Sequence, residues 1–306
     1  MRALVTGASG FIGGVLCGRL LAEGHQVDAL VRRAASAPQG TNALQGDLGD
    51  EARLTELIVA ARPDCVLHLA AEIASQRDVG RLIDVNVGGT RRLLAACVAA
   101  TAGDPSSGPR FVFASTVVTG DAHGAVLRED EPLPVQTAYG RAKQEGERLV
   151  LSSGLPCAII RPSHVYGPGG WYAQEMLPRL RQPGRFAVIG SGANMWDVVH
   201  VDDVAGALML AAADPRSGEI YHVADDEPIT FYDFMALSAS ELGTGPPRRI
   251  PAALARLVAG APAVEALVRS ARSSNTKIRR DLGWQPRFPG SSAGVRDTVG
   301  ALAAAH

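Results

Sequence analysis

The chain has 306 residues, 46% of them hydrophobic, and a formal net charge of −1 at pH 7. This balance predicts a globular protein with a large core, and it gives no electrostatic reason to expect a nucleic-acid partner. Membrane-spanning runs are not expected either, because arginines, Pro262 and Glu265 interrupt the most apolar segment, an amphipathic helix expected from Ala252.

The chain opens with a short apolar run, Arg2–Val5, followed by the glycine-rich stretch TGASGFIG at Thr6–Gly13. Apolar residues at helical spacing follow from Phe11 to Leu21, so the glycines lie on a strand-to-helix turn and not in a signal peptide. Glycine permits close backbone approach, and the free N–H groups at a helix start attract anions. The turn therefore predicts a phosphate site, although an ordinary tight turn is the alternative for this motif alone.

Strands and helices then alternate along the chain. Strands are expected at Gln26–Val31, just before Gly46, at Asp64–Ala71, from Arg110 to Thr116 and at Cys157–Ser163. Helices are expected at Glu51–Ala61, Ile83–Ala100 and Tyr139–Ser152, and a surface loop at Thr101–Pro109. This alternation predicts an α/β fold of Rossmann type, with a doubly wound parallel sheet. Because ligands bind at the carboxyl ends of such strands, one rim is expected to carry Gly7–Gly13, Arg32, Asp47, Ala70, Ser115 and Ser163.

Beyond Arg161 the alternation becomes looser and the chain richer in turns. We expect residues 1–162 to form a NAD(P)-binding Rossmann domain, to which strands around 197–224 return. Residues 163–306 are expected to form mainly a smaller, discontinuous C-terminal substrate-binding domain. The four cysteines lie in apolar surroundings without a CxxC pair, which predicts reduced core residues in a cytoplasmic protein. The seven histidines are scattered, so no metal site is expected.

The stretch YGRAK, from Tyr139 to Lys143, is the strongest catalytic signal. Residues four apart share a helix face, so the phenol and the ammonium can point into one cleft, where the cation lowers the pKa of the tyrosine. The chain has only two lysines and otherwise uses arginine, which favours a compact ammonium here. Ser115, at the end of an expected strand, can hydrogen-bond a substrate oxygen beside Tyr139. A turn-capping serine is the alternative, and Thr116 can share the role.

With these motifs in this order, the chain resembles the extended short-chain dehydrogenase/reductase family, also described as NAD-dependent epimerase/dehydratase. This group includes sugar-nucleotide epimerases and dehydratases and plant-type flavonoid ketone reductases. The likeness covers nearly the whole length and includes GDL, HLAA, NVGGT, RPSHVYGPG, VHVDDVAGA and LGWQPRF.

The resemblance implies the role of each motif residue. Those implied to contact the cofactor, by its pyrophosphate, adenine or ribose, are Gly7, Gly10, Phe11, Ile12, Gly13, Asp47, Leu48, Ala70, Ala71, Tyr139 and Lys143. Lys143 also lowers the pKa of Tyr139, which exchanges a proton with the substrate oxygen as hydride moves, while Ser115 polarises that oxygen.

The end of the second strand bears on the choice of cofactor. It carries Arg32 and Arg33 and no acid, since Asp28 lies earlier in the strand. An acid at this tip usually accepts the ribose 2′-hydroxyl of NAD, whereas an arginine can pair with the 2′-phosphate of NADP. NADP is therefore favoured, with NAD possible; a surface arginine pair is the alternative interpretation.

Two departures from the family pattern bear on the reaction. Dehydratases follow the strand Ser/Thr with an Asp-Glu pair, whereas Thr116 and Val117 follow Ser115 here, so dehydration is not expected. Epimerases usually carry a diphosphate-binding arginine where this chain has Trp196, and an indole suits a flat or apolar substrate. Alternatively, Trp196 is core and Arg269 or Arg272 grips the diphosphate.

The predicted substrate pocket combines aromatic and polar side chains: Thr116, Ser163, His164, Trp171, Tyr172 and Trp196. Trp171 and Tyr172, together with Met176, could equally form a core. We expect an NADP(H)-dependent ketone reductase or alcohol dehydrogenase acting on a partly apolar, non-nucleotide small molecule. A nucleotide-sugar epimerase is the nearest alternative. A non-catalytic dinucleotide sensor is another, though it would have no use for a proton donor.

A homodimer is also expected. The helices at Ile83–Ala100 and Tyr139–Ser152 present apolar residues beyond what one sheet face needs, namely Leu93, Leu94, Val98, Leu149 and Val150. The resemblance implies that these helices pair between subunits.

Overall fold

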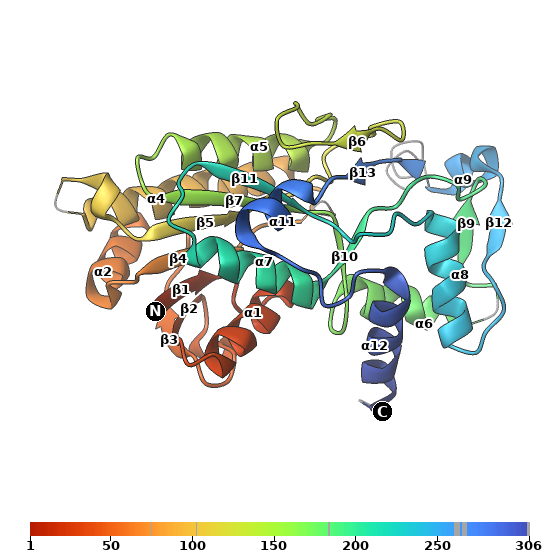
Figure 1. Ribbon diagram of the computed structural model, residues 1–306, viewed down its shortest axis with the longest axis horizontal. Helices are drawn as coiled ribbons and strands as arrows, with labels where there is room; N and C mark the ends of the chain where they lie inside the picture. The colour runs from red at the N-terminus through yellow and green to blue at the C-terminus, as the bar shows by residue number, and fades with distance from the viewer. Residues whose placement is uncertain (74, 102, 183, 260–263, 265–267, 305–306) are drawn as a thin grey trace.

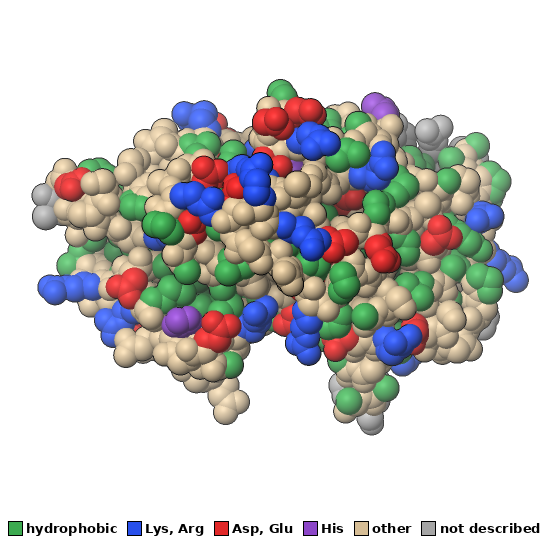
Figure 2. Space-filling view, in the orientation of Figure 1, with side chains coloured by type: hydrophobic (Ala, Val, Ile, Leu, Met, Phe, Trp, Pro, Cys, Tyr) green, Lys and Arg blue, Asp and Glu red, His purple; other side chains and the backbone are tan. Residues whose placement is uncertain are grey.

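The structure is a computed structural model of the chain. It describes residues 1–73, 75–101, 103–182, 184–259, 264 and 268–304. Over these ranges, no helix combines the length and the apolar character that a bilayer crossing requires. The four cysteines are free and buried, as expected. On the face shown in Figure 2, acidic and basic side chains are interspersed.

Seven parallel strands make up the main sheet in the described part of the chain (Figure 1). Their order is β11 (Glu219–Val223), β7 (Cys157–Pro162), β5 (Arg110–Ala114), β4 (Cys65–His68), β1 (Arg2–Thr6), β2 (Gln26–Val31) and β3 (Asn42–Gln45). The strand order reverses between β1 and β4, which is where sheets of this kind bind ligands at the carboxyl ends. The predicted Rossmann-type, doubly wound sheet is confirmed.

Helices cover both faces of this sheet. One face carries α1 (Phe11–Ala22), α7 (Val201–Ala213) and α11 (Thr276–Leu282), and the other carries α2 (Glu51–Ala61), α4 (Gly89–Ala99) and α5 (Ala138–Leu151). Each face has its own buried apolar cluster, because successive strand side chains point to opposite faces. On β5, Val112 points to the α1 and α7 face, whereas Phe111 and Phe113 point to the face covered by α5.

Two elements differ from the sequence-based expectation. The helix expected at Ile83–Ala100 begins earlier, as α3 (Val79–Ile83), and passes through a π-helical turn at Asp84–Gly88 before α4. Such turns occur where a side chain is used for another purpose, and here Asn86 hydrogen-bonds the backbone of Glu72. The strand expected to reach Ala71 ends at His68. The backbone N–H of Ala70 donates to the side-chain hydroxyl of Thr6 and so takes no part in the backbone pairing between strands.

Most elements after Pro162 lie beyond the main sheet. The strand pairs are β8 (His164–Tyr166) with β10 (Val198–His200), β9 (Ala187–Ile189) with β12 (Arg248–Ile250), and β13 (Arg272–Ser273) with the earlier β6 (Val126–Leu127). The helices are α6 (Leu177–Leu180), α8 (Phe231–Glu241), α9 (Ala252–Ala259) and α12 (Ser291–Ala304), with a π-helical turn at Tyr172–Met176. In Figure 1, α6, α8, β9 and β12 gather at the right. The amphipathic helix expected from Ala252 begins as α9, and most of the segment that follows lies outside the described residues.

Candidate active site

The glycine-rich turn between β1 and α1 is shaped by two close backbone approaches. Gly7 has a φ of +70°, and a Cβ added there would lie 2.7 Å from the backbone nitrogen of Ala70. A Cβ on Gly13 would lie 2.1 Å from the carbonyl oxygen of Gly7. Gly10 precedes α1 without a side-chain cap, so the first N–H groups of the helix have no side-chain partner. This geometry suits the pyrophosphate of a dinucleotide.

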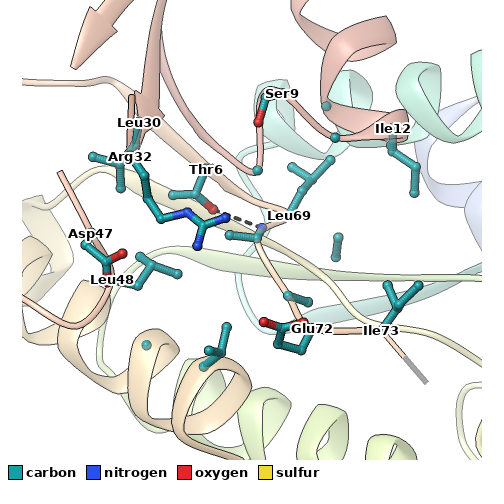
Figure 3. Close-up of a pocket in the computed structure, with 18 of the residues that line it drawn as sticks. Thr6, Ser9, Ile12, Leu30, Arg32, Asp47, Leu48, Leu69, Glu72 and Ile73 are labelled. Carbon is teal, nitrogen blue, oxygen red and sulfur yellow. Dashed lines mark hydrogen bonds between the residues drawn. The ribbon is translucent and has the colours of Figure 1, made fainter. Parts of the chain in front are cut away.

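A cleft of about 520 Å³ opens over this turn (Figure 3). The predicted cofactor residues that line it are Gly7, Gly10, Phe11, Ile12, Gly13, Arg32, Asp47, Leu48, Ala70, Ala71, Tyr139 and Lys143. Arg33 is not among the lining residues, because the chain turns away into a short 3₁₀ helix at Ala34–Ser36. The cleft has the size of a small-molecule site, and together with the turn it fits a nicotinamide dinucleotide.

A buried chain of hydrogen bonds fixes the floor of the cleft. The N–H of Ala70 donates to Thr6 Oγ1 (3.1 Å), which lies 2.7 Å from His68 Nδ1, and His68 Nε2 lies 2.9 Å from Thr90 Oγ1. Thr90 donates in turn to the carbonyl of Asn86. Burial lowers the pKa of His68 to about 3, so the ring is neutral. Thr6 therefore donates to Nδ1, and Nε2–H donates to Thr90.

The cleft also holds charged groups that the sequence analysis missed. Glu72 receives a hydrogen bond from Arg81 (2.8 Å), which lowers the pKa of its carboxyl, and the charge of Arg32 acts in the same direction. Both oxygen and nitrogen of the Asn86 amide bond the backbone of Glu72, which pins this segment beside the cleft. Arg92 also lines the cleft, where it donates to the carbonyl of Leu48 and pairs with Asp84.

Tyr139 and Lys143 lie together on α5, as the four-residue spacing predicts. The Lys143 ammonium lies 6.0 Å from the centre of the Tyr139 ring and donates to the carbonyl of Ala114 (2.8 Å). Burial lowers the pKa of Lys143 to about 8 and raises the pKa of Tyr139 to about 12. The predicted lowering of the Tyr139 pKa is therefore not found here, because burial dominates and the ammonium is directed at a carbonyl.

Ser115 lines the same cleft, but its hydroxyl is bonded away from Tyr139. It donates to Glu147 Oε1 (2.5 Å), and Glu147 also accepts from Arg161 Nε (2.8 Å) and Nη2 (2.6 Å). Thr116 donates to the carbonyl of Pro162 (3.2 Å). The sequence analysis missed the buried Glu147–Arg161 pair, although Glu147 stands four residues after Lys143 on the same helix face and could have been found by that spacing.

None of the residues predicted for the substrate pocket lines this cleft. The ring of His164 stacks on Trp196, with the ring centres 3.7 Å apart, and His164 Nε2 lies 3.3 Å from Arg269 Nη2. Burial lowers the pKa of His164 well below its usual value, so the ring is neutral. Ser163 is buried, and its hydroxyl has no hydrogen-bond partner among the residues described.

The predicted aromatic pocket residues have different environments. Trp196 and Tyr172 belong to the buried apolar cluster formed with α6 and α8, and the Tyr172 hydroxyl bonds Ser238 (2.6 Å). Tyr172 has no exposed surface, so it cannot touch a substrate in this conformation, because it fills the core. Trp171 is exposed at the surface and donates to the carbonyl of Val165.

A family model described as "NAD dependent epimerase/dehydratase family" matches residues 3–224. The chain belongs to this family. It is 36% identical over 302 residues to a 3-diazoavenalumate denitrifying reductase from Streptomyces sp., covering 94% of this chain and 97% of the relative. It is 31% identical over 330 residues to a UDP-glucose 4-epimerase from Mycolicibacterium smegmatis, with 98% and 97% covered.

A solved structure gives the same result. The UDP-glucose 4-epimerase of Thermus thermophilus, in complex with NAD, matches with a TM-score of 0.83 and 26% identity over 100% of both chains. The protein is thus an NAD-dependent oxidoreductase of the extended short-chain dehydrogenase/reductase family. When bound, the dinucleotide supplies or accepts hydride, and the chain's own residues position the substrate and move the proton.

The buried ammonium of Lys143 predicts a pH limit for dinucleotide binding. Its pKa of about 8 means that the charge is present below that pH and is lost above it. Since the charged form is the better partner for ribose hydroxyls and phosphates, we expect affinity for NADPH to be flat below about pH 8 and to fall above it. Fluorescence titration from about pH 6 to about pH 10 measures this dependence.

A pair of arginine variants provides the control. Lys143→Arg keeps its charge over this pH range and should abolish the fall in affinity. Lys277→Arg, at a lysine that pairs with Glu219 away from the cleft, should leave the fall in affinity unchanged. A flat profile in the unaltered protein would show that Lys143 does not contribute its charge to binding.

Proposed function

We propose that the protein is an NADP(H)-dependent ketone reductase or alcohol dehydrogenase whose substrate is a partly apolar, non-nucleotide small molecule with a carboxylate. In reduction, hydride adds to the carbonyl carbon and the proton of the Tyr139 hydroxyl goes to the oxygen. Lys143 holds the nicotinamide ribose. Two family relatives, named as a 2-alkyl-3-oxoalkanoate reductase and a ketoreductase, at 32% and 28% identity, support this reaction class.

Arg32 supports NADP as the cofactor. Its side chain points into the cleft from the end of β2 (Figure 3), and it makes no ion pair with any residue that the structure describes. Asp28, the acid of β2, is buried in the strand, where it accepts from Asn42 (2.7 Å), and so is not available at the tip. A free planar guanidinium at this position suits a 2′-phosphate.

Arg32→Ala should weaken NADPH binding and leave NADH binding nearly unchanged. Loss of charge-assisted hydrogen bonds costs about 1.5–3 kcal/mol, which is roughly a ten- to hundredfold loss of affinity. Arg33→Ala is the matched control, because its side chain lies outside the cleft. Steady-state kinetics with both dinucleotides measure the preference. Equal use of NADH and NADPH by the unaltered protein contradicts the assignment.

The buried guanidinium of Arg269, which lies beside His164 and outside the residues that line the cleft, is the observation behind the proposed substrate class. The residue is 9% exposed, its hydrogen bond is to the neutral ring of His164, and no carboxylate in the described residues forms an ion pair with it. Asp197 and Asp121 act on it only through space, and burial outweighs them and lowers its pKa to about 10, so it stays charged at neutral pH. A buried cation without a bonded counter-ion is costly unless an anion completes the site.

Comparison with two other arginines argues against a purely structural role for Arg269. Arg110 is also buried without a carboxylate, but it donates to the carbonyl of Ala211 in the last turn of α7, where a helix end is negative. Arg272 directs its guanidinium at the carbonyl of Gly124. Arg269 has no such acceptor among the residues described. The Streptomyces relative acts on a substrate named as an avenalumate, the anion of an acid, which supports a carboxylate here.

A nucleotide-sugar epimerase remains the second candidate, because Arg269 could also meet a diphosphate and one relative at 31% identity is a UDP-glucose 4-epimerase. Against it, Trp196 stands where epimerases of this family usually keep a second arginine and is stacked into the apolar cluster. A single guanidinium beside an aromatic wall fits one carboxylate on an apolar body better than a diphosphate.

The test is an assay of NADPH and NADH consumption against aromatic and aliphatic keto acids, their methyl esters, and UDP- and dTDP-sugars. We expect the keto acids to be reduced with kcat/KM about ten- to a hundredfold above their esters, because one charge-assisted pair is lost in the ester. Arg269→Met should remove this difference mainly through KM, since the contact is made equally in ground and transition states.

The control is Arg249→Met, at an arginine that stacks on Tyr232 and not beside His164. This variant should keep the difference between acid and ester. Saturable binding of UDP or dTDP by calorimetry, with no reduction of any keto acid, would favour the epimerase instead.

We also propose a homodimer. Leu93, Leu94 and Val150, predicted to point outward, are buried within the monomer core, so they cannot contribute. The apolar side chains exposed nearby are Val79 and Ile83 on α3 and Leu151 at the end of α5. Light scattering at micromolar concentration should give the mass of two chains, and Ile83→Glu should give one. A monomer in the unaltered protein would rule this out.

A further inference from the structure

We propose that Glu147 is a positioning residue of the hydride-transfer site. It fixes the direction of the Ser115 hydroxyl and supplies the negative charge that keeps Lys143 an ammonium. This inference rests on the proposed function, because it assigns Glu147 a part in that same reaction.

The placement of Glu147 follows from the geometry of α5. Tyr139, Lys143 and Glu147 are four residues apart, so they lie along one face of the helix at about 6 Å intervals. Tyr139 is half-buried at the cleft, whereas Lys143 is 4% and Glu147 5% exposed. Along this helix face, the side chains thus change from the half-buried Tyr139 at the cleft to the buried Lys143 and Glu147.

The carboxylate is held rigidly from β7. Arg161 donates two hydrogen bonds to Glu147, one to each oxygen, and its Nη1 lies 3.4 Å from His222 Nε2. Burial lowers the pKa of His222 to about 3, so its ring is neutral and Nε2 accepts this bond. Because Arg161 has partners on both sides, Glu147 cannot turn away without breaking several buried bonds.

This rigid carboxylate sets how Ser115 can act. A serine hydroxyl has one proton, and Ser115 gives it to Glu147 at 2.5 Å. Toward the cleft, Ser115 then presents only lone pairs, so it can accept a hydrogen bond from an alcohol but cannot donate one to a carbonyl oxygen. The hydroxyl of Thr116 likewise donates its hydrogen bond to the carbonyl of Pro162. Of these three hydroxyls, only that of Tyr139 has no protein acceptor among the residues described, which leaves its proton for the substrate.

The same carboxylate is the anion that faces Lys143. The other titratable groups that act on the ammonium are Tyr139 on α5 and the neutral His68 on β4. Arg161 on β7 is bonded to Glu147 itself. The attraction of Glu147 opposes the burial that lowers the pKa of Lys143. Without Glu147, Arg161 would lose its ion-pair partner and Lys143 would lose the anion that opposes its desolvation.

The test measures NADPH affinity against pH in two variants that remove negative charge near Lys143 by different routes. Glu147→Gln removes the anion and should move the loss of affinity to lower pH by about one unit, which is about tenfold weaker binding near pH 8. Arg161→Met leaves the Glu147 carboxylate buried without its ion-pair partner, which favours the neutral form of the carboxyl, so it should move the loss of affinity in the same direction. Glu145→Gln, on the same helix and paired with Arg148 at the surface, is the matched control and should not move it.

Two further measurements separate positioning from folding. Glu147→Asp keeps the charge and should restore the midpoint, while thermal unfolding reports the stability of each variant. A cycle of Ser115→Ala and Glu147→Gln on kcat/KM should be strongly non-additive if Glu147 acts through Ser115. Strict additivity there, or a pH midpoint that stays fixed or moves to higher pH in Glu147→Gln, would overturn the inference.

The titration uses NADPH without substrate, so its failure is distinct from failure of the proposed function. If the unaltered protein binds NADPH and reduces keto acids but the midpoint of Glu147→Gln does not move, only the inference fails. If no dinucleotide-dependent reduction occurs at all, the proposed function fails first.

Discussion

The buried ion pair between Glu147 and Arg161 is the contact on which the geometry of the reacting groups depends. It joins α5 to β7, and the hydroxyl of Ser115 ties it to the end of β5. A buried pair of this kind stabilises only if nearly all its donors and acceptors are satisfied, and here the carboxylate accepts three hydrogen bonds. The pair thereby fixes the rotation and height of α5 against the sheet, and with them the point at which Tyr139 emerges.

The opposite wall of the cleft is held by a neutral network. Thr6, His68 and Thr90 link β1 and β4 to the π-helical turn before α4, and Asn86 in that turn pins Glu72. Because each proton in this chain has one possible direction, the wall has little freedom to rearrange. The cleft thus lies between the Glu147–Arg161 ion pair on one side and the neutral Thr6–His68–Thr90 network on the other.

The sequence was sufficient for the features that depend on local spacing. The bounds of β2 and α2, the glycine turn, the tyrosine and lysine four residues apart, and the family itself followed from periodicity and motif order. What it missed depends on contacts between elements. The π-helical turn exists because Asn86 reaches the backbone of Glu72. The direction of Ser115 depends on Glu147, and Tyr172 is core because α8 supplies Ser238.

Trp196 shows why a substitution in a motif is not enough to define a pocket. The indole that replaces an arginine was expected to touch substrate, but it stacks on His164 and packs against Phe231. Its effect is indirect: it holds the neutral His164 beside Arg269. The polar character of this part of the site therefore comes from Arg269, which lies outside the motifs that carry the family resemblance.

Burial acts in opposite directions on the pKa values of the two reactive groups. The same desolvation that lowers the pKa of Lys143 to about 8 raises that of Tyr139 to about 12, because each shift disfavours the charged form. At neutral pH the phenol is therefore protonated. A protonated phenol can give a proton to a carbonyl oxygen as hydride arrives, but it cannot take one from an alcohol without first losing its own. In the free protein Tyr139 is thus a proton donor, while Ser115, whose own proton is directed at Glu147, is an acceptor.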